Sequence, residues 1–375
     1  MSTEKTAALE HPLTQLYFFL TGGCNLRCRH CWIAPHYQET PRPEHSLDFE
    51  LLQRIIRQAK PLGLSAVKLT GGEPLLHPRI RDILSFLRAE NLGLMLETNA
   101  VLVTPELARL IAAFPELLVS VSLDSHRAEV HEWVRGREGC FADTLTGIRR
   151  LVEAGVTPQI IMTLMRRNRD DVEAIIPFAR NLGAVMVKYN IVQPQSRGEH
   201  LYETDEALTI PEIVELGRWV ELELSRRAPL HLYFHQPPAF QPLSRMIHRG
   251  DLSCNACGIL NILGVLPDGS WALCGLSEDV PELIFGHAAA DPVEEVWRDT
   301  PLLRELRRGL PHRLEGVCGD CLQKTICLGS CIAHNYTRTR SLWAPFWFCR
   351  EAEAAGLFPA SRRRSPAVGP DGPHA

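Results

Sequence analysis

Short apolar runs alternate with stretches of helical spacing along the first half of the chain. The apolar runs predict six strands, at residues 16–21, 66–70, 93–98, 117–124, 157–165 and 185–192. Between them, apolar residues recur at the helical period and predict helices at residues 47–60, 79–90, 105–114, 141–154 and 169–182. Strands and helices that alternate in this way build a parallel sheet with right-handed crossovers.

The number of strand–helix units limits the architecture. Six units fall short of the eight in a closed (β/α)8 barrel, so an open partial barrel and a doubly wound sheet both fit. In either architecture, functional residues gather at the C-terminal ends of the strands. Cys24, residues 71–74, residues 98–99 and Asp124 all follow such strand ends. We therefore expect the site at this edge of the sheet.

The pattern changes after the sixth strand. Residues 193–207 are polar and predict a loop, and Thr209 and Glu212 have the spacing of a capping box that opens a helix to about residue 227. A cysteine-rich segment with little helical pattern follows. The predicted division is a flexible N-terminus (1–13), a barrel (14–208), a helical bridge (209–249), a cysteine-rich domain (250–352) and a flexible tail (353–375) in which Arg362, Arg363 and Arg364 are solvated.

Composition excludes several classes of protein. Of the 375 residues, 45% are hydrophobic and 22% are charged, which is typical of a globular chain and not of a disordered one. The formal net charge of −4 provides no basic surface for nonspecific binding of nucleic acid. No run of about 18 apolar residues could span a membrane, and the N-terminus has no apolar signal segment. We expect a cytoplasmic protein with neither a nucleic-acid partner nor a membrane partner.

The twelve cysteines are the unusual feature of the composition. Cys24, Cys28 and Cys31 form one group, eight more lie between Cys254 and Cys349, and Cys140 stands alone. Clustered cysteines in a chain without a secretory signal indicate metal or cluster ligands rather than disulfides. The isolated Cys140 is interpreted as a buried apolar residue.

The first group has the spacing Cys-x3-Cys-x2-Cys directly after the first strand. A [4Fe–4S] cluster is usually held by four thiolates, so three would leave one iron open to a small molecule. A zinc site completed by His30 or His36 is the alternative that spacing alone leaves open.

This motif resembles that of the radical S-adenosylmethionine (SAM) enzymes, and further residues match that family in the right order. The resemblance implies a partial (β/α)6 TIM-type barrel in which Cys24, Cys28 and Cys31 hold a [4Fe–4S] cluster that binds SAM. The residues implied to contact the cofactor are Gly71, Gly72, Glu73, Pro74, Thr98, Asn99, Ser122, Asp124 and Arg135. Asn168 and Gln193 are weaker positional matches.

The family's chemistry follows as an implication of the resemblance. The reduced cluster donates an electron to the bound SAM, whose cleavage gives a 5′-deoxyadenosyl radical that abstracts hydrogen from the substrate. The cofactor supplies the difficult step, and the protein orients and shields it. A flavodoxin or ferredoxin is the implied electron donor. The sequence identifies no catalytic acid or base.

The second group of cysteines resembles the SPASM extension of these enzymes. Cys257 to Cys349 follow the extension's spacing, including Gly269, and Cys254 adds an eighth thiol. Structural zinc ribbons are the alternative from local spacing. The resemblance implies two fully ligated auxiliary [4Fe–4S] clusters, one held by Cys254, Cys257, Cys274 and Cys331 and the other by Cys318, Cys321, Cys327 and Cys349.

The resemblance favours a peptide or protein substrate, such as a ribosomally made precursor peptide that is cross-linked, epimerised or spliced with excision of tyramine. A separate partner protein, or the SPASM segment itself, would then recognise the peptide. Sulfatase-maturing members carry an Asp where Gly275 follows Cys274, so formylglycine formation is disfavoured, and Asp279 is a weak substitute. The alternatives are a small substrate, such as a haem precursor or an aminoglycoside, and a non-catalytic zinc-binding protein.

Overall fold

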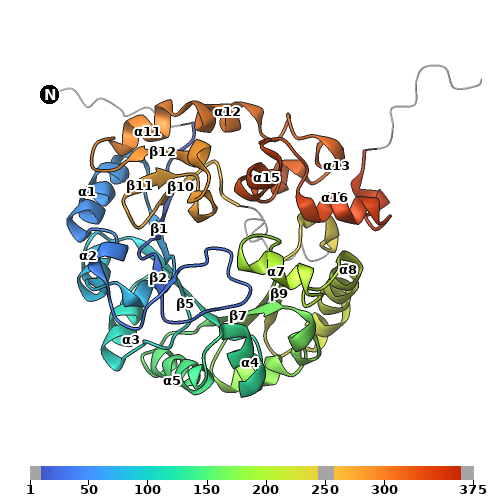
Figure 1. Cartoon of the computed structure of the whole chain (residues 1–375), viewed down its shortest axis with the longest axis horizontal. Coiled ribbons are helices and arrows are strands. Elements are labelled where there is room, and N and C mark those ends of the chain that lie inside the picture. The colour runs from blue at the N-terminus through green and yellow to red at the C-terminus, as the bar shows by residue number, and fades with distance from the viewer. Residues whose placement is uncertain (1–9, 244–256, 365–375) are drawn as a thin grey trace, which may run out of the picture.

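Six parallel strands form the central sheet of the computed structural model, which describes residues 10–243 and 257–364. They are β1 (Gln15–Phe19), β4 (Ala66–Thr70), β5 (Gly93–Thr98), β6 (Leu117–Ser122), β7 (Gln159–Leu164) and β8 (Met186–Ile191). Each pairs in parallel with the next in this order. Figure 1 shows the strands curving into an open ring, so the predicted partial barrel is confirmed and the doubly wound alternative is wrong.

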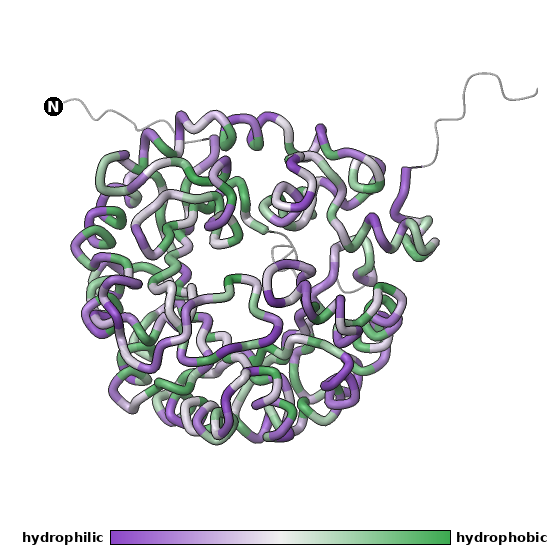
Figure 2. Tube along the Cα trace, viewed as in Figure 1, coloured by the Kyte–Doolittle hydropathy of each residue, from purple (hydrophilic) through white to green (hydrophobic). Residues whose placement is uncertain are grey.

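Helices cover the outside of this ring (Figure 1). They are α1 (Phe49–Ala59), α2 (Ile80–Ala89), α3 (Pro105–Ala112), α4 (Ala128–Arg135), α5 (Cys140–Glu153) and α6 (Ile175–Asn181). In α1, Leu52, Ile55 and Ile56 are buried at helical spacing, and Asp48 caps the first turn by accepting from the Leu51 amide. Green and purple alternate along these helices in Figure 2, as expected for helices with one face on a sheet.

The segment after β8 departs from its prediction only in part. The expected loop contains α7 (Arg197–Glu203). The expected helix is confirmed: the capping box of Thr209 and Glu212 opens it, and it continues to Arg227 as α8 (Ile210–Trp219), a π-helical turn (Val220–Leu224) and the short α9 (Ser225–Arg227). The bridge also contains β9 (His231–Phe234), which pairs in parallel with β8 and extends the sheet. This strand has only four residues, which is why its pattern was missed.

The cysteine-rich region extends the other edge of the same sheet. In this region, β10 (Ile262–Val265) pairs in parallel with β1, and β11 (Ser270–Ala272) and β12 (Ile284–His287) follow in antiparallel order. The expectation of few helices is wrong, since this region contains α11 (Val293–Asp299), α12 (Pro301–Gly309), α13 (Gly316–Gly319), α14 (Lys324–Cys327), α15 (Ile332–Thr339) and α16 (Trp347–Ala354).

Both ends of the described chain are more firmly attached than the sequence predicts. Leu13 is fully buried, and the carbonyl oxygen of His11 accepts a hydrogen bond of 2.9 Å from the Trp297 indole. At the other end, the buried Arg362 donates to the Gln241 carbonyl at 2.9 Å. The prediction that Arg362 is solvated is therefore wrong, whereas Arg363 and Arg364 are exposed.

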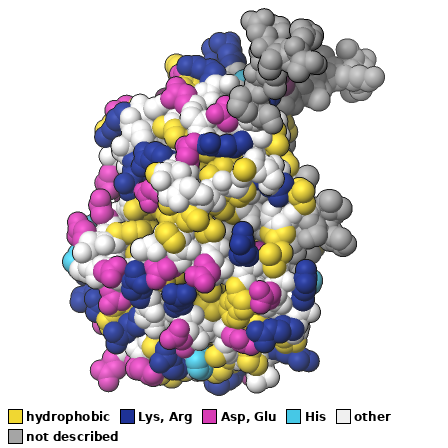
Figure 3. All heavy atoms as spheres, turned by 90° about the vertical axis from the view of Figure 1, so that its right-hand side faces the viewer, with side chains coloured by type: hydrophobic (Ala, Val, Ile, Leu, Met, Phe, Trp, Pro, Cys, Tyr) yellow, Lys and Arg dark blue, Asp and Glu magenta, His cyan; other side chains and the backbone are white. Residues whose placement is uncertain are grey.

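The outer surface mixes apolar and charged side chains. Figure 3 shows the right-hand face of Figure 1, where a band of hydrophobic side chains lies among charged side chains of both signs. Among the described residues, no helix combines the length and the apolar character that a bilayer crossing requires.

Candidate active site and cluster-binding sites

The first three cysteines lie on the loop that follows β1, in the middle of the extended sheet. Cys24 forms the short strand β2 (Gly23–Cys24), which pairs with β3 (His36–Tyr37), so the loop folds back on itself. The loop is also attached to the end of α4, because the Arg27 and Arg29 amides donate to the Arg135 and Val134 carbonyls at 3.0 and 2.9 Å. These contacts bring the three thiols together at the C-terminal edge of the barrel strands.

The thiols of this loop are poorly suited to remain as isolated anions. Cys24 and Cys28 are buried, and burial raises the pKa of both thiols above the ordinary value. Each neighbouring cysteine adds repulsion between thiolates and raises the pKa further. A bound cation or metal centre would reverse this preference, because metal coordination removes the thiol proton. The donor set therefore fits an iron–sulfur cluster.

The residues 71–74 cross directly beneath this loop. Gly71 has a φ of +118°, a backbone conformation that favours glycine, and a Cβ on Gly72 would overlap the carbonyl oxygen of Gly23. The Glu73 amide donates to the same Gly23 carbonyl at 2.9 Å, and Pro74 begins a buried 3-10 turn. Only a pair of glycines lets the two backbones approach this closely, so the spacing of the cluster loop depends on them.

The Glu73 side chain is buried and receives hydrogen bonds from both sides. Its carboxylate accepts from the Thr98 hydroxyl at 2.7 Å, the Asn99 amide at 2.8 Å and the Leu75 amide at 3.1 Å. Burial raises the pKa of Glu73 to about 7, although these hydrogen bonds lower it. The Asn99 side chain in turn donates to Asn25 of the cluster loop at 2.8 Å. The structure therefore brings Glu73, Thr98 and Asn99 together beside the three thiols.

Asp124 and Arg135 form a buried ion pair at the end of β6. Arg135 Nε lies 2.6 Å from Asp124 Oδ2, and Arg135 Nη1 also donates to the Cys28 sulfur at 3.5 Å. Burial alone would raise the pKa of Asp124, but the Arg135 guanidinium lowers it below its ordinary value. Arg135 therefore places a positive charge beside Cys28. Ser122 lies at the end of the same strand, half-buried.

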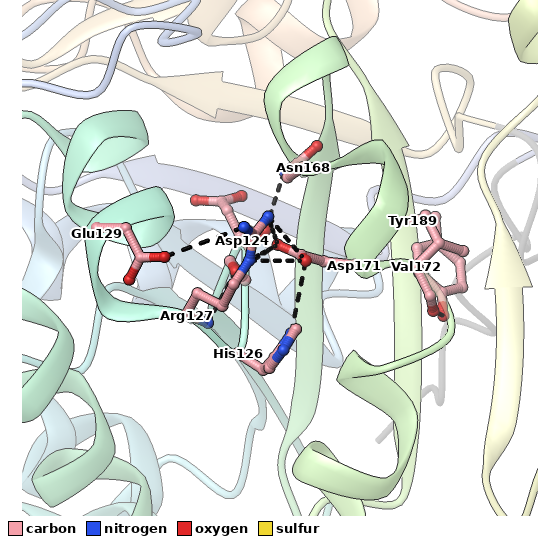
Figure 4. A network of polar contacts seen from close by, with 9 residues as sticks. Asp124, His126, Arg127, Glu129, Asn168, Asp171, Val172 and Tyr189 are labelled. Carbon is pink, nitrogen blue, oxygen red and sulfur yellow. Dashed lines mark hydrogen bonds and ion pairs between the residues drawn. The ribbon is translucent and has the colours of Figure 1, made fainter.

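A second polar network supports Asp124 from the outside (Figure 4). Asn168 donates to the Asp124 carbonyl at 2.9 Å and to the Thr163 carbonyl at 2.8 Å. The buried Asp171 accepts from Ser125 and from Arg127. Asn168 thus fixes the neighbouring strand ends. Gln193, which follows the end of β8, accepts a hydrogen bond from the Trp347 indole at 3.1 Å.

Several buried polar atoms around the three thiols have no hydrogen-bond partner. They are Asn25 Nδ2, His30 Nε2 and His131 Nε2. Burial lowers the pKa of both histidines to about 4, so their rings are neutral near pH 7. Buried polar atoms are normally paired, so these groups fit a site whose remaining partner is a polar ligand such as SAM.

Inside the barrel, charged residues face the lumen. Lys68 and Glu97 form an ion pair of 2.6 Å on neighbouring strands, and Lys68 Nζ lies 5.0 Å above the centre of the Tyr17 ring. Burial alone would raise the pKa of Glu97, but Lys68 and, from across the lumen, Lys188 lower it below its ordinary value. The alternate residues Val67 and Leu96 are fully buried, so the charged side chains must point inward. Sequence reasoning missed these lumen residues, whose signal is a single charged residue in each of three otherwise largely apolar strands.

One set of SPASM cysteines surrounds a single cavity. Its lining includes four thiols, of Cys318, Cys321, Cys327 and Cys349. Lys324 and apolar residues that include Leu314 and Phe358 complete the wall. Burial raises the pKa of Cys327 to about 12, and Cys318 and Cys321 add to this effect. The four thiols that the resemblance groups together therefore share one pocket in the structure.

The other set lies between the SPASM region and β1. Burial raises the pKa of Cys257, and the nearby Cys331 raises it further. Burial likewise raises the pKa of Tyr17 to about 12, and Cys257 and Cys274 add to this increase. These thiols are therefore neighbours of the lumen side chain Tyr17. Cys254 lies outside the described residues.

Gly275 is packed where a larger side chain would not fit. A Cβ at this position would overlap the ring of Phe19 on β1. The aspartate that sulfatase-maturing enzymes carry here would therefore need the Phe19 ring to move. Asp279, four residues later, is exposed.

The remaining metal and thiol predictions can be placed as well. All eleven cysteines among the described residues are free of disulfides. Within those residues, no three His, Cys, Asp or Glu side chains converge closely enough to hold a single metal ion, as a zinc site would. Cys140 is fully buried and packs against Cys24, Leu26 and Cys28, in agreement with its interpretation as an apolar residue.

Comparisons with known proteins agree with this geometry. The sequence model of the radical SAM superfamily matches residues 18–179, and that of the SPASM iron–sulfur cluster-binding domain matches residues 253–322. The chain is 29% identical to the AdoMet-dependent heme synthase of Methanosarcina barkeri over 85% of this chain and 91% of that protein. It is 28% identical to the mycofactocin maturase MftC of Mycobacterium tuberculosis over 88% of this chain and 80% of that protein.

The fold is shared with a solved structure as well. The crystal structure of Streptococcus suis SuiB bound to the precursor peptide SuiA aligns with a TM-score of 0.69 and 18% identity, over 92% of this chain and 77% of SuiB. The cofactors of the two matched domains are SAM with a [4Fe–4S] cluster in the barrel and iron–sulfur clusters in the SPASM domain. The chain therefore carries a radical SAM domain followed by a SPASM iron–sulfur cluster-binding domain.

Proposed function

We propose that Cys24, Cys28 and Cys31 hold the SAM-binding [4Fe–4S] cluster and that the surrounding polar residues bind SAM. The observation that carries this proposal is that the thiol loop lies directly on residues 71–74, beside Glu73, Asn99 and Arg135. When bound, SAM and the reduced cluster supply an organic radical that removes hydrogen from the substrate.

The chain's own residues hold and shield this chemistry. The Glu73 carboxylate is placed to accept a hydrogen bond from an ammonium group of SAM, since Thr98 and Asn99 fix its orientation. Arg135 pairs with Asp124 and donates to the Cys28 sulfur, so its positive charge would stabilise the Cys28 thiolate that holds the cluster. The barrel wall around the lumen excludes bulk water.

For the SPASM region we propose two auxiliary clusters with four thiolates each. The shared cavity of Cys318, Cys321, Cys327 and Cys349 supports one ligand set. The proximity of Cys257, Cys274 and Cys331 supports the other, which Cys254 would complete. With all irons ligated, these clusters would support the fold and carry electrons rather than bind the substrate.

For the substrate we propose a ribosomally made precursor peptide. MftC is named a maturase, and the fold shared with SuiB can admit a precursor peptide. The polar lumen, with Lys68, Glu97 and Lys188, also suits the side chains and backbone of a peptide. A separate leader-binding protein and a flavodoxin or ferredoxin would be the partners, in a reducing cytoplasm that keeps the thiols free.

A haem precursor is the second candidate substrate, because a heme synthase is among the relatives of similar identity. Anaerobic reactions of the reconstituted enzyme, SAM and dithionite with short peptides encoded near its gene, and separately with iron coproporphyrin, would distinguish the two. We expect a mass change in one peptide and none in the porphyrin. A change in the porphyrin alone would overturn the peptide proposal.

A further inference from the structure

Three exposed arginines lie on or next to the thiol loop. Arg27 and Arg29 directly flank Cys28, and Arg167 comes from the segment after β7. The Arg27 and Arg29 amides donate to two successive carbonyls at the end of α4, which fixes the backbone at both residues. We call Arg27, Arg29 and Arg167 the arginine face.

Aromatic rings hold these arginines in place without neutralising them. The Arg27 guanidinium lies 3.9 Å from the centre of the Tyr37 ring, and those of Arg29 and Arg167 each lie 4.6 Å from the centre of the Trp133 ring. Stacking of this kind leaves the N–H edges of a guanidinium available for carboxylates. The three charges are therefore preorganised for an acidic partner.

Carboxylates of this chain do not occupy the arginine face. None of the three arginines has a carboxylate oxygen within 4.0 Å among residues 10–243 and 257–364. Two carboxylates of the same region bond to other residues: Asp143 pairs with Arg137, and Glu39 accepts from the Tyr37 hydroxyl. The whole chain has a net charge of −4. A group of positive charges that no carboxylate of the described chain pairs with attracts an acidic partner to this place.

From this arrangement we propose that the arginine face docks a small acidic electron-transfer protein, which reduces the cluster held by Cys24, Cys28 and Cys31. One electron would leave the reduced donor and enter the cluster for each SAM cleaved, and no atom would be transferred. Arg27 and Arg29 adjoin a ligand of this cluster in sequence, so a donor bound here is close to it. The inference rests on the proposed function, since it takes these thiols as the cluster ligands.

The test compares two reductants in the absence of substrate. Formation of 5′-deoxyadenosine is measured with a limiting amount of reduced flavodoxin, and again with dithionite, which needs no docking surface. The variants are Arg167→Glu, which lies outside the thiol loop, and Arg27→Glu/Arg167→Glu. The control is Arg88→Glu/Arg308→Glu, which reverses two exposed charges on α2 and α12.

We expect the flavodoxin-driven rate to fall about tenfold in the double variant at low salt, with a smaller fall in Arg167→Glu. The dithionite-driven rate, the iron content and both rates of the control should be unchanged. Added salt should lower the flavodoxin-driven rate of the wild type and of the control, and should have little effect on that of the double variant. An equal loss with both reductants, or no loss with flavodoxin, would overturn the docking site. Absence of 5′-deoxyadenosine from the wild type with dithionite would overturn the proposed function and the docking site with it.

Discussion

The barrel and the SPASM region place their cysteines in opposite settings. In the barrel, three thiols share one loop of eight residues and lie beside Glu73, Asn99 and Arg135, with unpaired polar atoms nearby. In the SPASM region, Cys318, Cys321, Cys327 and Cys349 come from separate turns and helices and line a cavity with mainly apolar walls. The comparison separates a site built to take a polar ligand from one built to be closed by its own thiolates.

The largest effect should come from opening the closed site. Cys318→Ala/Cys349→Ala removes two of the four thiols in the shared cavity. Metal binding contributes directly to folding, on the order of 10 kcal/mol for a structural metal, which is comparable with the stability of a whole domain. We expect rapid proteolysis of the segment around residues 310–364, measured under anaerobic conditions. Cys140→Ala serves as the control, and equal protease resistance of wild type and double variant would contradict the structural role.

The glycine pair tests how tightly the open site is packed. Gly72→Ala places a methyl group on the Gly23 carbonyl, so the thiol loop must move and SAM cleavage should fall more than tenfold. Gly22→Ala is the matched control on the same loop, because its nearest neighbours would be 3.9 Å away. Equal rates of 5′-deoxyadenosine formation in the two variants would show that the close approach is unimportant.

Glu73→Gln keeps the shape of the side chain and removes its charge. Loss of a hydrogen bond to a charged group costs about 1.5–3 kcal/mol, which corresponds to SAM binding that is weaker by about 10- to 100-fold. Calorimetric titration of the reconstituted enzyme with SAM would measure this change. Glu138→Gln, at an exposed position, is the control.

The same carboxylate predicts a pH dependence. Because burial raises the pKa of Glu73 to about 7, the carboxylate forms only as the pH rises through neutrality, and SAM affinity should rise with it. The folded protein keeps this proton to a higher pH than the unfolded chain does. The contribution of Glu73 to stability should therefore fall as the pH rises from about 4.3 to about 7. A SAM affinity that does not change across neutral pH in the wild type would refute this role.

The smallest effect concerns the attachment of the C-terminal segment to the closed site. Arg362→Ala removes the buried hydrogen bond to the Gln241 carbonyl and should lower the free energy of unfolding by about 1–3 kcal/mol. Arg364→Ala, at an exposed position, should leave it unchanged. Thermal unfolding of the cluster-loaded proteins would compare the two, and identical midpoints would mean that Arg362 contributes nothing.

The sequence predicts local features of this protein better than its distant contacts. All six barrel strands and the grouping of the first three cysteines with residues 71–74 follow from periodicity and motif spacing. The pairing of β10 with β1, the four-residue β9 and the burial of Arg362 depend on contacts between segments far apart in the chain. Charged lumen residues such as Lys68 and Glu97 were missed because an apolar strand pattern does not show which face lines a cavity.

The central claim is that three thiols hold an open cluster in the barrel and that the SPASM thiols hold two closed ones. The most direct measurement is the iron content and SAM cleavage of Cys24→Ala/Cys28→Ala/Cys31→Ala, purified and reconstituted without oxygen. We predict about twelve irons in the wild type and about eight in the variant, with no 5′-deoxyadenosine from the variant. Continued SAM cleavage by the variant, or a colourless wild-type protein that contains zinc, would contradict the account.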